Sequence, residues 1–391
     1  MVDLPIIARF SKDSTDSISL DSVEPVDPIG TVGLSKALFS WPASVFSHAF
    51  RYAGLLTPSL LVALASSSAA AEANYLSPSD LVATKDGKTL YVACETAGQV
   101  MVFDTTTEKV TARHTVAKVH EFALSPDEQR LYVTGGTSHG VLQEVEVKSG
   151  KTLRSFPAGH TPMSPRLTQD GKTLFYCNRH ARVDQPDLHA VDVATGKTRR
   201  SVKAIREPVS LCLSKDEQTL WAFNHLPLME ANVSNVFTSV CVYDAKTLNK
   251  RATLDLPSGS FAIRDSIMST DGKYCFVTHT IGRFTVPTTH LDRGWINTSA
   301  ISVFDVEKCA YINTALLDDT MRGAANPWGV DITADGKWLC ITAAGINELL
   351  VIPIPAMMKR ITSSAKPKEI VNDLSFLYGA KTRVPMEKCL G

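Results

Sequence analysis

The chain has 391 residues, and its 40 Lys and Arg residues balance its 40 Asp and Glu residues to a formal net charge of zero. Hydrophobic residues make up 44% of the chain, which excludes a fully disordered protein because this much apolar surface can be buried. The balanced charge argues against general electrostatic capture of nucleic acid, which requires a basic surplus. We therefore expect a globular protein with no nucleic acid as its partner.

The first 71 residues are not expected to join the fold. Residues 1–49 are rich in Ser and Asp, and they are too long for the basic start of an export signal, which indicates a disordered leader or a misassigned start. Residues 50–71 resemble a signal peptide, because Arg51 precedes an uncharged apolar stretch that ends in Ala69-Ala70-Ala71. This pattern predicts export and cleavage. The alternatives are a membrane anchor over 52–71, the one case in which we expect contact with a membrane, and a buried helix.

Residues 75–355 consist of a repeated unit. Each unit has an apolar strand, a tight turn centred on Asp, a second apolar strand, a loop and, in most units, a third strand that ends near Asp. The turn residues are Asp86, Asp127, Asp170, Asp216, Asp271 and Asp335. Within each unit the hydrophobic period is two, which excludes an α-solenoid. Repeats of roughly 40–45 residues with four strands predict the four-stranded antiparallel blades of an all-β propeller.

Residues 356–391 begin with a short helix-like piece and continue as a linker. We expect this segment to be a linker followed by an incomplete blade, so that the chain is truncated or its ring closes through an irregular last blade.

The repeat resembles a known family. Tyr91-Val92-Ala93-Cys94 and Tyr132-Val133-Thr134-Gly135 resemble the YVTN repeat, whose members are extracytoplasmic propellers with seven blades, whereas this sequence has six repeat units. The stretches over 279–284, 287–295 and 322–329 resemble bacterial propellers that continue into a haem domain of the cytochrome c peroxidase type. These resemblances imply a bacterial protein of the periplasm or the extracellular space.

Polar residues gather in the loops that lead into the first strand and in those that follow the second strand. In an antiparallel blade both loops lie at one face, opposite the Asp turns, and Asn178, Asn224 and His279 stand at the same position of their units. We expect a ring of side chains that binds an anionic or polar ligand; the alternative is that they only hold strand ends and loops in place. The candidate ligand-binding residues are His120, Glu121, His160, Asn178, His180, Arg206, Glu207, Asn224, His225, Arg264, Asp265, His279, Arg283, His290, Asp292, Arg293, Asn326 and Trp328.

No residue pattern defines a catalytic site. Glu121, Glu207 and Asp265 are candidates for a general base or for ion pairs with Arg206 and Arg264. No metal-ligand spacing and no C-x-x-C-H haem motif is present, so we expect no cofactor in this chain and haem only in a missing or separate domain. The eight cysteines stand mostly in apolar stretches and are expected to be buried.

The sequence therefore favours a ligand-binding or protein-interaction module over an enzyme, with an unknown protein or a small polar molecule as partner. Two alternatives remain: the substrate or sensor part of a haem-dependent, cytochrome c peroxidase-like oxidoreductase, and a lactonase-like hydrolase.

Overall fold

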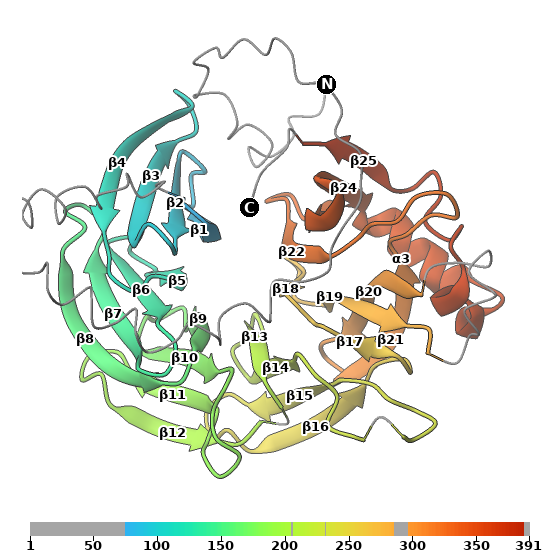
Figure 1. Cartoon of the computed structure of the whole chain (residues 1–391), viewed down its shortest axis with the longest axis horizontal. Coiled ribbons are helices and arrows are strands. Elements are labelled where there is room, and N and C mark those ends of the chain that lie inside the picture. Colours follow the sequence, from blue (N-terminus) through green and yellow to red (C-terminus); the bar gives the residue numbers. More distant parts are fainter. Residues whose placement is uncertain (1–74, 205, 231, 285–295, 387–391) are drawn as a thin grey trace, which may run out of the picture. The chain divides into compact units, whose positions relative to one another are not determined.

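The computed structural model describes residues 75–204, 206–230, 232–284 and 296–386. These residues form six antiparallel sheets that are arranged as a six-bladed β-propeller (Figure 1). The predicted all-β fold and its four-stranded antiparallel blades are confirmed. The expectations for residues 1–49 and 50–71 lie outside the described residues. Among the helices that are described, none is both long and apolar enough to cross a membrane.

Each blade is a meander whose first strand lies at the centre of the ring and whose last strand lies at the rim (Figure 1). The central strands are β1 (Pro78–Ala83), β5 (Glu121–Leu124), β9 (Pro162–Leu167), β13 (Pro208–Leu213), the pair β17 (Ser260–Phe261) and β18 (Ser266–Met268), and β22 (Pro327–Ile332). The second strands are β2 (Thr89–Cys94), β6 (Arg130–Gly135), β10 (Thr173–Asn178), β14 (Thr219–Asn224), β19 (Tyr274–Gly282) and β23 (Trp338–Ala343).

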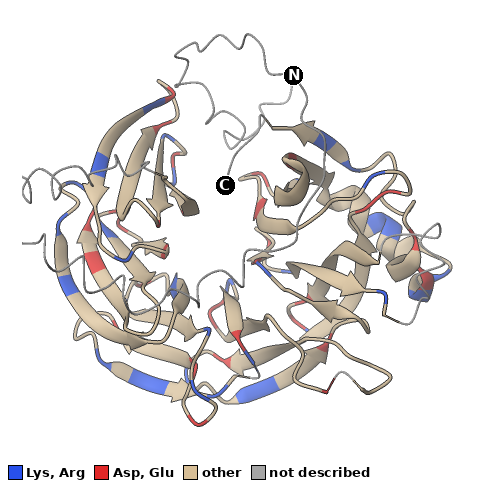
Figure 2. Ribbon diagram, viewed as in Figure 1, with Lys and Arg blue, Asp and Glu red and all other residues tan. Residues whose placement is uncertain are grey.

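The two outer strands complete each sheet. The third strands are β3 (Gln99–Asp104), β7 (Gly140–Glu146), β11 (Leu188–Asp192), β15 (Ser239–Asp244), β20 (Asn297–Asp305) and β24 (Glu348–Pro353). The rim strands are β4 (Lys109–Thr115), β8 (Thr152–Gly159), β12 (Thr198–Val202), β16 (Lys250–Asp255), β21 (Ala310–Leu316) and β25 (Thr382–Pro385). Figure 2 shows Lys and Arg along the rim strands β8, β12 and β16.

The turn between the first two strands of each blade is built around its Asp. In blade one, the Asp86 carboxylate accepts hydrogen bonds from the Thr84 hydroxyl (2.7 Å) and from the Lys88 amide (3.0 Å), and these bonds lower the pKa of Asp86. Gly87 lies between them with φ +67°, a conformation that favours glycine. The same two hydrogen bonds recur at the turns of Asp127, Asp170, Asp216, Asp271 and Asp335. The sequence repeat is thus a repeated hydrogen-bond pattern.

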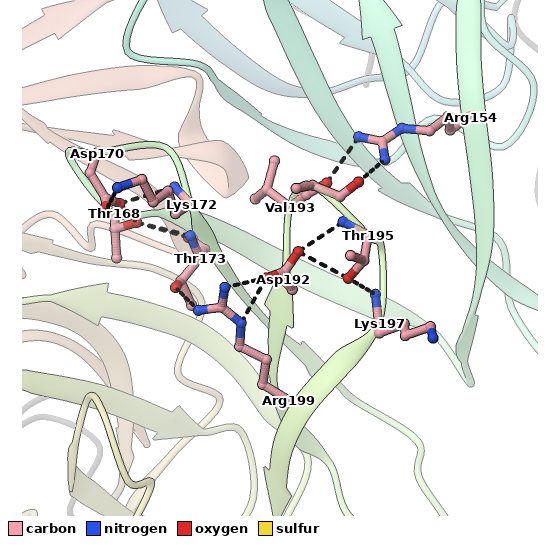
Figure 3. A network of polar contacts seen from close by, with 11 residues as sticks. Arg154, Thr168, Asp170, Lys172, Thr173, Asp192, Val193, Thr195, Lys197 and Arg199 are labelled. Atoms are coloured by element: carbon pink, nitrogen blue, oxygen red, sulfur yellow. Dashed lines mark hydrogen bonds and ion pairs between the residues drawn. The ribbon is translucent and has the colours of Figure 1, made fainter.

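A similar turn on the outer part of blade three ties that blade to blade two (Figure 3). The Asp192 carboxylate accepts hydrogen bonds from the Thr195 amide (2.8 Å) and from Arg199 Nε (3.0 Å). Arg154, on β8 of blade two, donates to the Val193 carbonyl at 2.9 Å. Arg199 therefore holds the Asp192 side chain within the turn, and Arg154 holds the turn backbone from the neighbouring blade.

Hydrophobic layers hold successive blades together. Between blades four and five, the Phe304 ring lies 5.8 Å from the Trp221 ring and 6.5 Å from the Phe223 ring, and all three side chains are fully buried. Comparable apolar layers lie at each junction from blade one to blade six. Buried aromatic rings contribute strongly to such layers because each removes about 150–250 Å² from water.

The C-terminal segment adds the last strand of blade six. After β24, the chain forms helix α3 (Ile354–Ser363) and the short helix η5 (Pro367–Asn372), and then returns as β25, which pairs with β24. Arg383 on β25 donates to Glu348 at 2.7 Å and to Asp319 at 2.9 Å. Within the described residues, the segment that we expected to begin another blade thus completes the sixth.

Candidate functional site

The central strands begin, and the second strands end, at one end of the ring, which we call the mouth. Because adjacent strands are antiparallel, this end lies opposite the Asp turns. Arg179 follows β10, Glu207 precedes β13, and Arg264 precedes β18, while Trp328 lies in β22. We call these residues, together with His180 and His225, the mouth cluster; they come from blades three, four, five and six.

Arg264 and Trp328 form one half of the mouth cluster. The Arg264 guanidinium carbon lies 4.3 Å from the centre of the Trp328 ring, which is a favourable cation–π geometry. Burial, together with the positive charge of Arg179, lowers the pKa of Arg264. The Trp328 side chain is still 47% exposed, so this pair presents both a cation and an apolar surface.

Arg179 and Glu207 form the other half. Arg179 Nε lies 3.7 Å from Glu207 Oε2, which is an ion pair without a hydrogen bond. The Nε atoms of Arg179 and Arg264 are both buried, and neither has a hydrogen-bond partner among the described residues. The mouth cluster thus contains two guanidinium groups and one carboxylate, which is an excess of positive charge.

Two histidines line the same mouth in their neutral form. His225 Nδ1 lies 2.8 Å from the Ile263 carbonyl, so this nitrogen carries the proton and Nε2 is an acceptor in the neutral ring. Burial lowers the pKa of His225, and the charges of Arg179 and Arg264 act in the same direction. Burial likewise lowers the pKa of His180. The neutral histidines add hydrogen-bonding groups without adding charge at pH 7.

His160 lies beside His180. The Thr161 hydroxyl bridges them, with Oγ1 at 2.9 Å from His160 Nδ1 and at 3.1 Å from His180 Nδ1. The two rings meet edge to face at 5.5 Å. Both histidines were predicted from the sequence as candidate ligand-binding residues, but their pairing was not predicted.

Glu121 and Asp265 lie deeper, on the wall of the central channel, where they join neighbouring blades. Glu121 Oε2 accepts a hydrogen bond from the Ser164 amide of the next blade. Asp265 Oδ2 accepts one from the Val330 amide of the next blade at 3.1 Å. Asp80 does the same for the Phe122 amide at 2.9 Å. These carboxylates act as clips between central strands, so a structural role explains Glu121 and Asp265 without a general base.

The clip carboxylates surround an arginine. Burial by itself would lower the pKa of Arg166. The negative charges of Cys212, Asp265, Asp80 and Glu121 have a larger effect in the other direction, so the pKa of Arg166 is raised. Burial raises the pKa of Asp80 to about 8, and the charge of Glu121 adds to the effect. Asp80, Glu121 and Asp265 are therefore three acidic groups close enough to stabilise the charge of Arg166.

Three predicted site residues have side chains that are buried within their blades. His279 is fully buried and its Nε2 lies 2.7 Å from the Ser302 hydroxyl, because β19 continues to Gly282 where we expected a loop. Burial lowers the pKa of His279 to about 4. Asn178 and Asn224 are the last residues of β10 and β14 and are also buried. Asn224 Nδ2 donates to the Ser239 carbonyl at 3.0 Å.

The remaining predicted residues contact other groups, are exposed, or lie outside the described residues. Arg283 donates to Asn372 at 2.5 Å and to the Val371 carbonyl at 2.9 Å, and so fixes η5. His120 Nδ1 pairs with Glu95 at 2.9 Å. Arg206 and Asn326 are exposed, and Arg206 donates to the Pro227 carbonyl at 3.2 Å. His290, Asp292 and Arg293 lie outside the described residues.

The ion pairs differ from those expected. Glu207 pairs with Arg179 and not with Arg206, while Asp265 accepts backbone amides and forms no ion pair with Arg264 among the described residues. Arg179, Asp80 and Arg166 were missed as site residues. A signal for Arg179 was present, because it directly follows Asn178, and alternation along a strand turns the next side chain to a different environment.

No group of three or more His, Cys, Asp or Glu side chains in the described part of the chain is arranged to hold a metal ion. The seven described cysteines are free thiols, and all but Cys309 are buried.

Comparison with known proteins supports the fold. No family model matches the chain. A solved structure of hydrazine synthase from Kuenenia stuttgartiensis superposes with a TM-score of 0.71 at 23% sequence identity, covering 80% of this chain and 88% of that chain. In sequence, the chain is 24% identical to hydrazine synthase subunit beta of Kuenenia stuttgartiensis over 104 residues, which is 27% of each protein. The matched segment thus spans about a quarter of the curated relative, and the likeness establishes a β-propeller.

Proposed function

We propose that this chain is an extracytoplasmic propeller of the YVTN type that acts as an interaction module and binds its partner at the mouth. The observation that carries the proposal is the mouth cluster itself, in which charged and aromatic side chains from four blades meet on one face. Arg and Trp are the side chains that most often dominate binding energy at protein interfaces.

Two further observations support this role. The curated relative is a subunit, and association with other chains is what a subunit does. The export-like stretch over residues 50–71 and the YVTN-like strands of blades one and two support an extracytoplasmic location. A propeller that presents a rigid face of loops is well suited to such a role, because its strands position the loops without moving.

The test is quantitative co-purification of the tagged full chain from its native host. We expect wild-type protein to enrich one or more partners, Arg264→Ala to reduce that enrichment at least about tenfold, and Lys337→Ala to leave it unchanged. Lys337 is the matched control because it is an exposed cation at the opposite end of blade six. Equal enrichment by both variants, or none by the wild type, would contradict the proposal.

The proposal also includes the absence of a catalytic role. A turnover activity of the purified chain that is lost in Arg264→Ala protein would overturn this part and would favour the oxidoreductase or lactonase alternative.

A further inference from the structure

We propose that the mouth cluster binds a carboxylate group, with Arg179 and Arg264 as its two cationic contacts. This inference rests on the proposed function and names the chemistry of the group that is bound. The carboxylate can belong to a free organic acid or to an acidic residue of a polypeptide, and the experiment below separates these sources.

The first step is the state of the guanidinium donors. Each guanidinium has five N–H donors in a planar fork, and the side chains of Arg179 and Arg264 donate no hydrogen bond to another described residue. By contrast, Arg383 and Arg154 each donate several hydrogen bonds to carbonyl and carboxylate oxygens. Among the described residues, the two mouth arginines are thus held by an ion pair and by a ring contact, and their hydrogen-bonding capacity is not used by that part of the chain.

The second step is the charge. Arg179 and Arg264 contribute two positive charges and Glu207 one negative charge, while burial keeps His180 and His225 neutral at pH 7. Counted over the mouth cluster alone, the excess is one positive charge, which one singly charged carboxylate neutralises. The positive charges are also close enough for Arg179 to disfavour the charge on Arg264, and a bound anion relieves this repulsion.

The third step is shape. A carboxylate is planar and presents two oxygens, which suits the fork of a guanidinium. Beside Arg264, the Trp328 ring is 47% exposed and offers an apolar surface for the carbon chain that bears the carboxylate. Glu207 weakens the binding of a carboxylate, because its own carboxylate lies 3.7 Å from Arg179 and repels a second anion.

The experiment is isothermal titration of the full chain with propionate, with inorganic phosphate, and with the blocked tripeptides acetyl-Ala-Glu-Ala-amide and acetyl-Ala-Gln-Ala-amide at constant ionic strength. We expect propionate or the Glu peptide to bind more tightly than phosphate and the Gln peptide. Arg179→Gln and Arg264→Gln should each weaken binding about tenfold or more, Glu207→Gln should strengthen it several-fold, and Lys337→Gln should change nothing.

The source of the carboxylate follows from comparing the affinity for propionate with the affinity for the Glu peptide. Tighter binding of the Glu peptide than of propionate assigns the site to a polypeptide, and equal binding assigns it to a free acid. Phosphate binding as tight as propionate, no binding of either acid, or binding that survives both arginine substitutions would overturn the inference. In that case partner enrichment that still depends on Arg264 would leave the proposed function standing.

Discussion

At the scale of single residues, burial decides what each polar side chain can do. His279 lies shortly before the end of the second strand of blade five, and His225 directly follows the second strand of blade four. His279 is nevertheless buried inside its blade, whereas His225 joins the mouth cluster. His279 shares a hydrogen-bond chain with Ser302 and Thr314, whose hydroxyls are 2.6 Å apart. It is therefore a core residue whose polar atoms are satisfied by neighbouring strands.

This environment gives His279 a measurable pH dependence. Its pKa is about 4 in the folded protein, below the usual 6.5, so the unfolded chain binds a proton more readily between these values. The contribution of His279 to stability is present above pH 6.5 and is lost as the pH falls towards 4. Urea unfolding at several pH values should show this loss in the wild type.

Replacing His279 should remove its own share of the pH effect, while the share of His189, whose pKa burial also lowers to about 4, remains, and it should weaken the fold. His279→Ala should lower the free energy of unfolding at pH 7 by about 2–4 kcal/mol, because it leaves a cavity and takes from the buried Ser302 hydroxyl one of its two hydrogen-bond partners. Binding at the mouth by the folded fraction should be unchanged. A variant as stable as the wild type would show that His279 is not a core residue.

At the scale of elements, the central strands are joined by side chains that reach from one blade to the next. Asp80, Glu121, Ser164 and Asp265 each accept a backbone amide of the following central strand. The residues that supply these amides are all buried. Each clip therefore satisfies a donor that burial would otherwise leave unpaired.

Glu121 allows a test of the clips. Glu121→Ala leaves the Ser164 amide without its acceptor, and we expect the free energy of unfolding to fall by about 1–3 kcal/mol. Glu121→Gln keeps a carbonyl oxygen in the same place and should cost much less. Chemical denaturation of both variants at pH 7 measures the difference, and equal losses would contradict the clip.

The elements also show which features a sequence can predict. The six Asp turns and the strands that follow them depend on residues within a few positions of each other, so their pattern was visible in the sequence. The length of β19 was not visible in the sequence, because it depends on pairing with β20, which follows only after an intervening segment. That one misplaced strand end is the reason why His279 was assigned to a loop.

At the scale of the whole molecule, the ring brings together residues that are far apart in the chain. The sequence placed His180, Glu207, His225, Arg264 and Trp328 on one face, and the structure shows Arg264 against Trp328 and His225 near both arginines. It did not reveal that Glu207 pairs with Arg179, because this depends on how blades three and four sit side by side. The strand order predicts which residues share this face, whereas the contacts between their side chains depend on how neighbouring blades pack.

The central claim is that the mouth is the surface through which the propeller binds. The most direct test places a photo-crosslinking amino acid at Trp328, and in a second protein at Lys337, in the full chain in its native host. We predict a crosslinked partner from position 328, where the side chain is 47% exposed beside Arg264, and none from position 337 at the opposite end of the same blade. Crosslinks from position 337 alone, or equally from both positions, would contradict the claim.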